Sequence, residues 1–205
     1  VMDAEITVVK FFTLKEHECF NRFVEDQKQC VCCWALVAAE LVSYAIKTSD
    51  RRNKFMKDWN ASAQELVDMY PKRYPSKTGR LHVEGCHVGH PRRALEYVKE
   101  HGITLKTVYP YVARRQLDKE PPLGIFSEEV VVPPTDGIWW HAVLIIGWGV
   151  DSLGRKFYQI KNAWGEGWGD HGYAKILCDI VYPLCYVEGD AFFMKPWYYS
   201  HLFFD

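Results

Sequence analysis

A cysteine, a histidine and an asparagine stand in that order along the chain, each inside its own local pattern. Cys33 opens a long apolar run, His141 follows a pair of tryptophans, and Asn162 comes directly after a lysine. A thiol becomes an effective nucleophile when a base stands beside it and a third group holds that base in orientation. These residue types are therefore the parts of a covalent acyl-transfer site in which the thiol forms a thioester.

The segment from Cys33 to Ile46 is expected to form the helix that positions the thiol. Its apolar residues fall on nearly every side, as in a helix buried in a core, and the run is longer than a typical strand. The unpaired N–H groups and the helix dipole at Cys33 favour an anion, so we expect them to stabilise a thiolate. A neighbouring imidazolium would lower the pKa of the thiol further.

The histidine and the asparagine are expected on two strands. His141 begins an apolar segment over residues 141–148, and Asn162 ends the next strand, over residues 156–161. The carboxamide oxygen of Asn162 could then accept a hydrogen bond from the imidazole ring and fix its orientation. Trp164 could shelter that hydrogen bond from water and so strengthen it.

Two N–H donors are candidates for holding an oxyanion near the thiol. Gln27 precedes Cys33 by a few residues, so its side-chain amide is near enough to donate. The second donor would be the backbone N–H of Cys33 itself. Donors aimed at the place where negative charge develops are usually the largest contribution to this kind of catalysis.

The remaining elements are indicated by capping signals and breakers. The pattern Ser-Ala-Gln-Glu at residues 62–65 is a capping box that opens a short helix to residue 67, and Pro71 is expected to break regular structure beyond it. Pro91 and Gly102 bound a helix over residues 92–101. Further strands are expected over residues 8–12, 104–108, 130–132 and 173–177. A helical half followed by a strand-rich half indicates an α+β chain with two lobes.

Length and composition exclude several classes of protein. The chain has 205 residues, 48% of them hydrophobic and 15% aromatic, which is typical of a globular protein with a substantial core. Its formal net charge of -1 argues against a nucleic-acid-binding surface. No run approaches the roughly 18 to 20 apolar residues of a membrane span, and the first residues lack the basic and then apolar pattern of a signal peptide.

The cysteine content favours a secreted or vesicular compartment over the cytosol. The chain has 7 cysteines, and an odd number leaves at least one free thiol if the others pair. Cys30, Cys32, Cys86, His87 and His90 do not form the two paired C-x2-C units typical of a zinc site. We therefore expect no metal.

Four ordered segments resemble the active-site segments of papain-like cysteine proteases. Residues 26–34, Asp-Gln-Lys-Gln-Cys-Val-Cys-Cys-Trp, are similar to that family's Gln, two residues, Cys-Gly-Ser-Cys-Trp. Residues 84–91 resemble its Gly-Cys-Asn-Gly-Gly segment, residues 141–149 resemble its histidine strand, and residues 160–173 are close to its asparagine segment. The resemblance covers about residues 24–196.

The resemblance implies one papain-like peptidase unit over residues 1–205, with a two-lobe α+β fold. A mainly helical lobe would cover residues 27–108, and a mainly β lobe, with a shortened sheet, would cover residues 109–205. The sheet is expected to be short because the family's histidine lies roughly 130 to 150 residues after its cysteine. His141 follows Cys33 more closely than that.

Carried over position by position, the resemblance implies a role for each residue of the site. Cys33 would be the nucleophile, His141 the base and then the acid, and Asn162 the residue that orients the histidine. Gln27 would be the oxyanion donor. The catalytic group is therefore expected to be Cys33, His141, Asn162 and Gln27.

The resemblance also implies residues that shape the cleft. Cys30 and Cys86 match a disulfide that ties the nucleophile loop to the cleft, and Gly89 matches a glycine that pairs with substrate backbone. An acid on the floor of the second specificity pocket would favour a basic substrate residue two before the scissile bond. The expected substrate contacts are Gly89, His90, Pro91, Ala142, Trp164 and Asp190.

Several residues depart from the family pattern. Val31 and Cys32 replace the glycine and serine before the nucleophile, and Val88 and Lys28 replace two further glycines. A β-branched residue does not take a positive φ comfortably, and it narrows the path for substrate backbone.

The residues and the resemblance together predict a thiol peptidase that hydrolyses peptide bonds through a Cys33 thioester and needs no cofactor. Its partners would be a peptide or protein substrate and a protein inhibitor in the cleft, with no nucleic acid. Its location would be the secretory pathway, the vacuole or lysosome, or the outside of the cell.

The shortened lobe and the lost glycines keep an alternative open, in which the chain is an inactive papain-like homologue that serves as a binding or scaffold protein. The natural substrate, a pro-segment and the oligomeric state are also left open. So is the pairing of Cys19, Cys32, Cys178 and Cys185.

Overall fold

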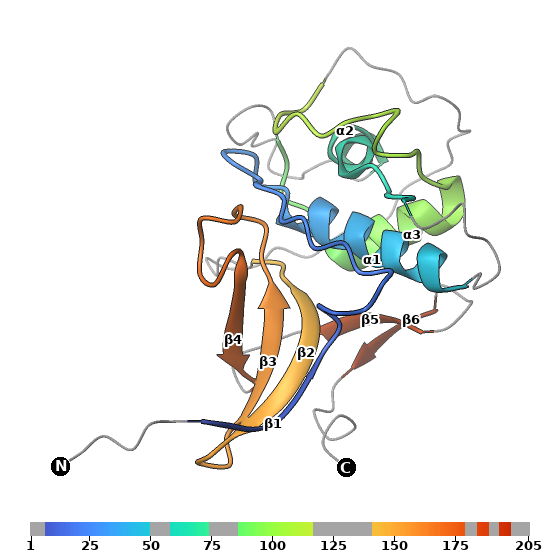
Figure 1. Ribbon diagram of the computed structural model, residues 1–205. Helices are drawn as coiled ribbons and strands as arrows, with labels where there is room; N and C mark the ends of the chain where they lie inside the picture. The colour runs from blue at the N-terminus through green and yellow to red at the C-terminus, as the bar shows by residue number, and fades with distance from the viewer. Residues whose placement is uncertain are drawn as a thin grey trace.

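Helices and strands occupy separate layers of the molecule. The computed structural model describes residues 7–49, 58–73, 86–116, 141–178, 184–188 and 193–197. Three helices form one layer, and a four-stranded antiparallel sheet lies beneath the first of them (Figure 1). The helices are α1 (Cys33–Ser49), α2 (Ala63–Arg73) and α3 (Pro91–His101). This is the α+β architecture that the sequence predicted.

The sheet joins the N-terminal segment to the second half of the chain. Its order is β1 (Val8–Thr13), β2 (Leu144–Asp151), β3 (Lys156–Lys161) and β4 (Tyr173–Leu177). A separate antiparallel pair is formed by β5 (Leu184–Glu188) and β6 (Phe193–Trp197). Gly149 of β2 allows the close packing of its neighbours, because a Cβ there would lie 2.4 Å from the Phe157 ring. All pairs in the sheet are antiparallel, so β2, β3 and β4 follow one another as a meander.

The largest apolar core lies between the helices. Ala35, Ala38 and Val42 of α1 are fully buried, and so are Leu66 of α2 and Ala94 of α3. Small residues on α1 let the other two helices approach closely, which explains why an apolar run with so many alanines forms a core helix. A second cluster joins the segment after β1 to the sheet; its buried members are Phe20, Val24, Ile146 and Tyr173.

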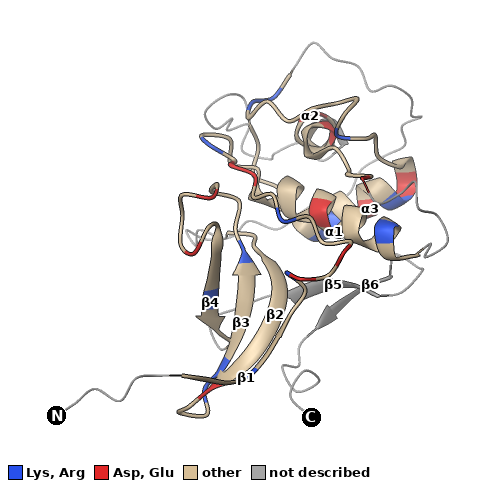
Figure 2. Ribbon diagram, in the orientation of Figure 1, with Lys and Arg blue, Asp and Glu red and all other residues tan. Residues whose placement is uncertain are grey.

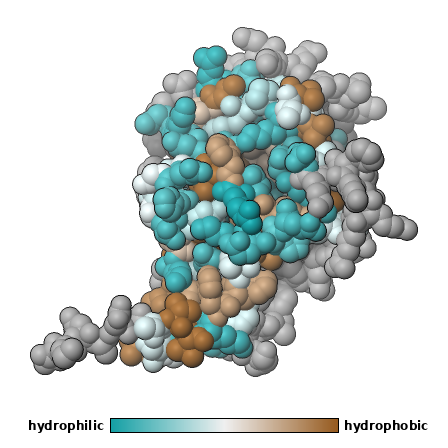
Figure 3. All heavy atoms as spheres, viewed as in Figure 1, coloured by the Kyte–Doolittle hydropathy of each residue, from teal (hydrophilic) through white to brown (hydrophobic). Residues whose placement is uncertain are grey.

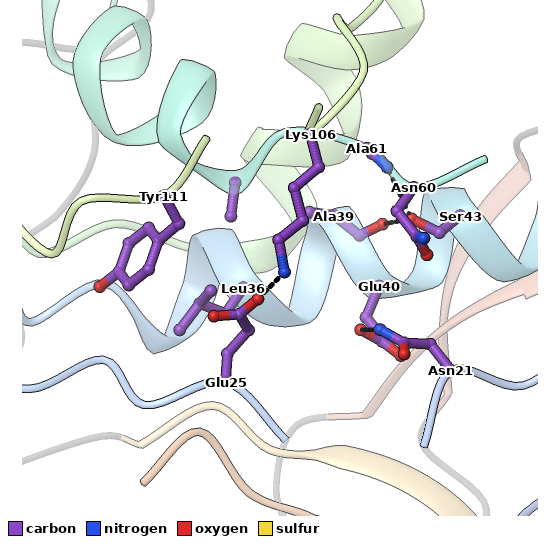
Figure 4. Close-up of a pocket in the computed structure, with 11 residues that line it drawn as sticks. Asn21, Glu25, Leu36, Ala39, Glu40, Ser43, Asn60, Ala61, Lys106 and Tyr111 are labelled. Carbon is purple, nitrogen blue, oxygen red and sulfur yellow. Dashed lines mark hydrogen bonds and ion pairs between the residues drawn. The ribbon is translucent and has the colours of Figure 1, made fainter. Parts of the chain in front are cut away.

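Charged side chains tie the helical layer to the sheet. The ammonium group of Lys161, at the end of β3, lies 2.8 Å from Glu40 Oε1 on α1 and donates to Asn21 O at 2.6 Å. Lys106 forms an ion pair with Glu25 close by. Asn21, Glu25, Glu40 and Lys106 are among the residues that line a cavity of about 20 Å³ (Figure 4). That volume is large enough for roughly one water molecule, so the cavity is not a peptide-binding site.

Acidic and basic residues are intermixed along the described parts of the chain (Figure 2). Apolar side chains are exposed on β1, where Val9 keeps 71% of its surface accessible. They form part of the brown area at the lower end of the molecule in Figure 3. None of the described helices is long and apolar enough to cross a membrane.

Most predicted elements are confirmed. Helix α1 begins at Cys33, α3 begins at Pro91 and is capped by Gly102 with φ 76°, and β3 and β4 have the expected bounds. Helix α2 is longer than predicted, because it continues to Arg73 with Pro71 inside its last turn. A proline is tolerated there when the turn is held by packing, and both Met69 and Tyr70 are buried.

Three expectations were wrong in detail. Ser62 Oγ accepts the N–H of Glu65 as a capping box requires, but the Glu65 carboxylate accepts from Thr104 N–H instead of reaching back to Ser62. The predicted strand over residues 104–108 is a turn with one isolated bridge, between Ala61 and Leu105. Strand β2 begins at Leu144, so His141 lies before the strand. The strand predicted over residues 130–132 lies outside the described residues.

Candidate active site

Cys33 is the first residue of α1, and a disulfide fixes the loop that leads to it. Cys30 and Cys86 are bonded, as the family resemblance implied, with their Cα atoms 5.4 Å apart and both side chains fully buried. The bond joins the nucleophile loop to the segment that precedes α3. Cys33 itself is a free thiol and keeps partial exposure.

The segment after Cys86 lies against the ring of Trp34. The indole N–H of Trp34 donates to the carbonyl oxygen of His87 at 3.0 Å. A Cβ at Gly89 would lie 2.5 Å from two atoms of the Trp34 ring, so no side chain fits at that position without a shift. The glycine is therefore required by packing, and it leaves the backbone of residues 88–90 open beside the nucleophile loop.

The residue that follows His141 contacts the thiol directly. The backbone N–H of Ala142 donates to Cys33 Sγ at 3.4 Å. The Ala142 side chain packs against the helical core. The segment just before β2 thus lies at the start of α1, and it brings Ala142 to Cys33, which is far from it in the sequence.

Asn162 fixes both the orientation and the proton of the imidazole ring. Its Oδ1 lies 2.7 Å from His141 Nε2 and also accepts the N–H of Ala163 at 2.8 Å. Because a backbone N–H donates to this atom, it must be the carboxamide oxygen, and Nε2 must carry the proton. In the neutral ring Nδ1 is then the nitrogen that can accept a proton.

Trp164 covers the histidine ring. The two rings are stacked, with centroids 4.4 Å apart and planes 20° apart. Trp164 remains 42% exposed and covers one face of the ring, while His141 as a residue is still exposed to solvent. Its own segment is held to the nucleophile loop by a bridge to Asp26 and by the Gln27 N–H, which donates to Ala163 O at 2.8 Å.

Gln27 lies in the loop just before the Cys30–Cys86 disulfide, and its role as an oxyanion donor stays a prediction. Its carbonyl oxygen accepts the hydroxyl of Tyr111 at 3.1 Å. Its side-chain oxygen is buried and has no hydrogen-bond partner among the described residues. The next residue, Lys28, has φ 52°, a left-handed conformation that glycine adopts more easily, and its N–H is held by Asp26 Oδ1 at 2.8 Å.

Burial affects the pKa of the Cys33 thiol more than the helix N-terminus does. Burial raises the pKa of Cys33, while the backbone N–H groups of Ala142, Trp34 and Cys33 oppose that shift. The N–H groups at the helix start lower the pKa of the thiol, as the sequence predicted, but burial raises that pKa by more. A thiolate in such a buried place requires a positive partner nearby, and the residue before the Cys33 contact at Ala142 is His141.

The structure separates the two adjacent cysteines. Cys32 is completely buried, and burial raises its pKa to about 12. Its Sγ lies 2.9 Å from the hydroxyl of Tyr111. Cys33 alone of the two combines partial exposure with contact to the segment of the histidine.

The residues expected to contact substrate are only partly brought together. His90 caps helix α3, where its Nδ1 accepts the N–H of Arg92 at 3.1 Å, and Pro91 occupies the first turn. Burial, together with Arg93 and Arg92, lowers the pKa of His90. Asp190 lies outside the described residues. The substrate contacts therefore stay predictions.

Sequence reasoning missed the contact of Tyr111 with the nucleophile loop. Its hydroxyl touches Cys32 and Gln27, which lie far from it in the sequence. No periodicity or spacing links such distant positions. Only chemistry could have hinted at a contact, because a buried tyrosine hydroxyl nearly always has a hydrogen-bond partner.

The polar groups of the site are those of a thiol hydrolase. Within the described ranges, no three His, Cys, Asp or Glu side chains gather closely enough to hold a metal ion. The thiol, the imidazole and the carboxamide between a helical layer and a sheet define a Cys-His-Asn site of the kind that thiol hydrolases use.

Comparisons with known proteins agree with this class. The sequence model described as "Papain family cysteine protease" matches residues 9–134 and 122–194. The chain is 28% identical over 203 residues to cathepsin L2 of Homo sapiens, covering 76% of this chain and 57% of that relative. It is 28% identical over 196 residues to papaya proteinase 4 of Carica papaya, covering 75% of this chain and 51% of that relative. The chain thus spans about half the length of the curated relatives that it matches.

Solved structures share the fold. A digestive procathepsin L2 proteinase from Tenebrio molitor larval midgut superposes with a TM-score of 0.60 at 23% identity, covering 85% of this chain and 64% of that chain. A structure from a study of antibody cross-reactivity between the mite allergens Blo t 1 and Der p 1 gives a TM-score of 0.60 at 21% identity, covering 86% and 68%. The chain belongs to the papain family of cysteine proteases and has the papain-like α+β fold.

Proposed function

We propose that this chain is a papain-like thiol peptidase, which hydrolyses peptide bonds through a thioester on Cys33. The observation that carries the proposal is the junction of three segments. Ala142 N–H reaches Cys33 Sγ at 3.4 Å, and His141 Nε2 lies 2.7 Å from Asn162 Oδ1. Membership of the papain family supports a peptide or protein substrate.

The reaction begins with a proton transfer within the Cys-His pair. His141 Nδ1 takes the thiol proton, and Cys33 Sγ attacks the carbonyl carbon of the scissile peptide bond. The oxyanion that forms is held by the side-chain amide of Gln27 and the backbone N–H of Cys33. When it collapses, the C–N bond breaks, His141 gives its proton to the leaving amine, and a thioester remains on Cys33.

The second half of the reaction restores the enzyme. Water enters where the amine has left and gives a proton to His141 as its oxygen attacks the thioester carbonyl. The C–S bond then breaks, the new carboxylic acid leaves, and the proton on His141 returns to Cys33. Each step uses only groups of this chain, the substrate and water.

The environment of the site disfavours a lone thiolate on Cys33, so a thiolate should form only together with the imidazolium of His141. Burial raises the pKa of Cys33, so the thiolate forms together with the imidazolium and not ahead of it. The Asn162 oxygen accepts from the ring and stabilises its positive form. Trp164 stacks on that ring and limits the access of water, which strengthens the hydrogen bond.

An oxidising compartment would preserve the disulfide that holds the nucleophile loop. The Cys30–Cys86 disulfide holds the nucleophile loop in place, and such bonds persist in secreted, vacuolar and lysosomal proteins. We propose a location along the secretory pathway. Treatment with a mild reductant should lower turnover, and unchanged turnover after proven reduction of this bond would argue against its role.

A peptidyl epoxide tests the proposed function directly, because its ring opening requires a reactive thiolate. We expect the epoxide to modify Cys33 stoichiometrically and to abolish peptide turnover, and Cys33→Ala to prevent both. Cys178→Ala is the matched control, since Cys178 is also a partly exposed cysteine; it should leave labelling and turnover unchanged. Folded protein that shows neither labelling nor turnover would reject the peptidase and leave a binding or scaffold role.

A further inference from the structure

The hydroxyl of Tyr111 joins two parts of the nucleophile loop. Its Oη lies 3.1 Å from the carbonyl oxygen of Gln27 and 2.9 Å from Cys32 Sγ. A carbonyl oxygen has no proton, so Tyr111 must donate to Gln27. Its single proton is then used, and Cys32 S–H must donate to the Tyr111 oxygen. The result is a directed chain from Cys32 through Tyr111 to Gln27.

The hydrogen bonds from Cys32 through Tyr111 to Gln27 connect the two residues that carry the proposed oxyanion donors. The backbone N–H of Cys33 belongs to the peptide unit that Cys32 begins, and the Gln27 side chain belongs to the residue whose carbonyl accepts from Tyr111. Gln27 Oε1 is buried and has no partner within the described ranges, so no described residue fixes the carboxamide through its own oxygen. The backbone of Gln27 is therefore the part through which its position is controlled.

The segment that carries Tyr111 is itself firmly held. Val112 N–H donates to Gln64 Oε1 at 2.9 Å, and Gln116 N–H donates to Asp68 Oδ1 at 2.6 Å. Both acceptors are on α2 and are fully buried. The tyrosine thus reaches the nucleophile loop from a segment that two buried side chains of α2 hold in place.

We propose that Tyr111 is a positioning residue for the reaction, and the inference rests on the proposed peptidase function. Its hydroxyl holds Gln27 and the Cys32–Cys33 peptide at the separation that the developing oxyanion requires. Removal of an oxyanion donor typically lowers kcat by about 10²–10³-fold. Loss of positioning forfeits part of that effect, so Tyr111→Phe should lower kcat by about 10- to 100-fold.

The test compares Tyr111→Phe with Tyr109→Phe. Tyr109 lies two residues earlier, and its hydroxyl donates to buried Asp68 at 2.8 Å, so the control loses a buried hydrogen bond without touching the nucleophile loop. We expect Tyr109→Phe to lower the thermal midpoint and to keep kcat within about twofold. Tyr111→Phe should lower kcat while the rate of epoxide alkylation of Cys33 stays within about twofold, because alkylation builds no tetrahedral oxyanion on a carbonyl carbon.

A double mutant then asks whether Tyr111 acts through Gln27. In a Gln27→Ala background, Tyr111→Phe should lower kcat by clearly less than in the wild-type background, because one of the two donors that it positions is already gone. An unchanged kcat for Tyr111→Phe, an equal loss in both backgrounds, or an equal loss of alkylation would each overturn the proposal. If wild-type protein is neither alkylated nor active, the proposed function fails at that point, before any variant is compared.

A second pair keeps the test open if Tyr111→Phe does not fold. Cys32→Ser retains a donor to the Tyr111 oxygen, and Cys32→Ala removes it. We expect kcat of the serine variant to exceed that of the alanine variant by about threefold or more. Equal values in two folded variants would contradict the role of this hydrogen-bonded chain.

Discussion

Replacing Asn162 by alanine removes the group that holds the imidazole. The change deletes the 2.7 Å hydrogen bond to His141 Nε2 and leaves the Ala163 N–H without its 2.8 Å acceptor. A hydrogen bond to a charged group contributes about 1.5–3 kcal/mol. If that bond is made to the imidazolium of the ion pair, kcat/KM should fall by about 10- to 150-fold at roughly 1.4 kcal/mol per factor of ten.

The structure places the Asn162→Ala effect toward the lower end of that range. Trp164 stays stacked on the histidine ring at 4.4 Å and continues to restrict its rotation. The orphaned Ala163 N–H is buried, so the unfolding free energy should also fall, by about 1–3 kcal/mol. Turnover of a fluorogenic peptide and urea denaturation measure the two effects separately.

Asn162→Asp is the matched control. It keeps an oxygen that can accept from both the ring and the backbone, so its kcat/KM should lie well above that of Asn162→Ala. The reasoning would be refuted by an alanine variant that is folded and turns over peptide at the wild-type rate. It would also be refuted if the aspartate variant were as slow as the alanine variant.

Three further predictions concern the loop, the cleft and the buried network. Lys28→Gly should raise the unfolding free energy by roughly 0.5–1 kcal/mol, because relief of left-handed strain, about 1–2 kcal/mol, exceeds the added entropy of the unfolded chain; a decrease in denaturant midpoint would contradict it. Gly89→Ala should slow turnover, because the new Cβ forces Trp34 to shift beside Cys33; unchanged Trp fluorescence and kcat would show that the ring does not move. Burial raises the pKa of Asp68 in the folded state, so its stabilising contribution is full below the ordinary carboxyl range and is lost as pH rises through the raised value. The difference in unfolding free energy between wild type and Asp68→Asn should therefore decrease from acid to neutral pH, and a difference that grows with pH would oppose the assignment.

Local signals account for much of the fold. The apolar run after Cys33 predicted α1, and Pro91 with Gly102 predicted α3, because burial pattern and caps act over a few residues. Helix α2 continued past its predicted end because packing held Pro71 within its last turn. Residues 104–108 have the composition of a strand but form a turn, since their backbone partners are set by Ala61 and its neighbours.

The site was predictable in its residues but not in its electrostatics. The order and local patterns of the sequence indicated Cys33, His141 and Asn162, and the family resemblance implied the role of each. The raised pKa of Cys33 could not be foreseen, because it depends on how deeply the folded lobes bury the sulfur. The Tyr111 contact was equally hidden, since it joins a segment held by α2 to the nucleophile loop across the fold.

Trapping the thioester tests the central claim most directly. The protein is mixed briefly with a nitrophenyl ester of a protected dipeptide, quenched in acid and examined by intact mass and peptide mapping. We predict a single acyl group on Cys33, released by neutral hydroxylamine and formed at least about 100-fold more slowly in His141→Ala. Folded protein that gains no acyl group on Cys33, or gains it at the same rate without His141, would contradict the account.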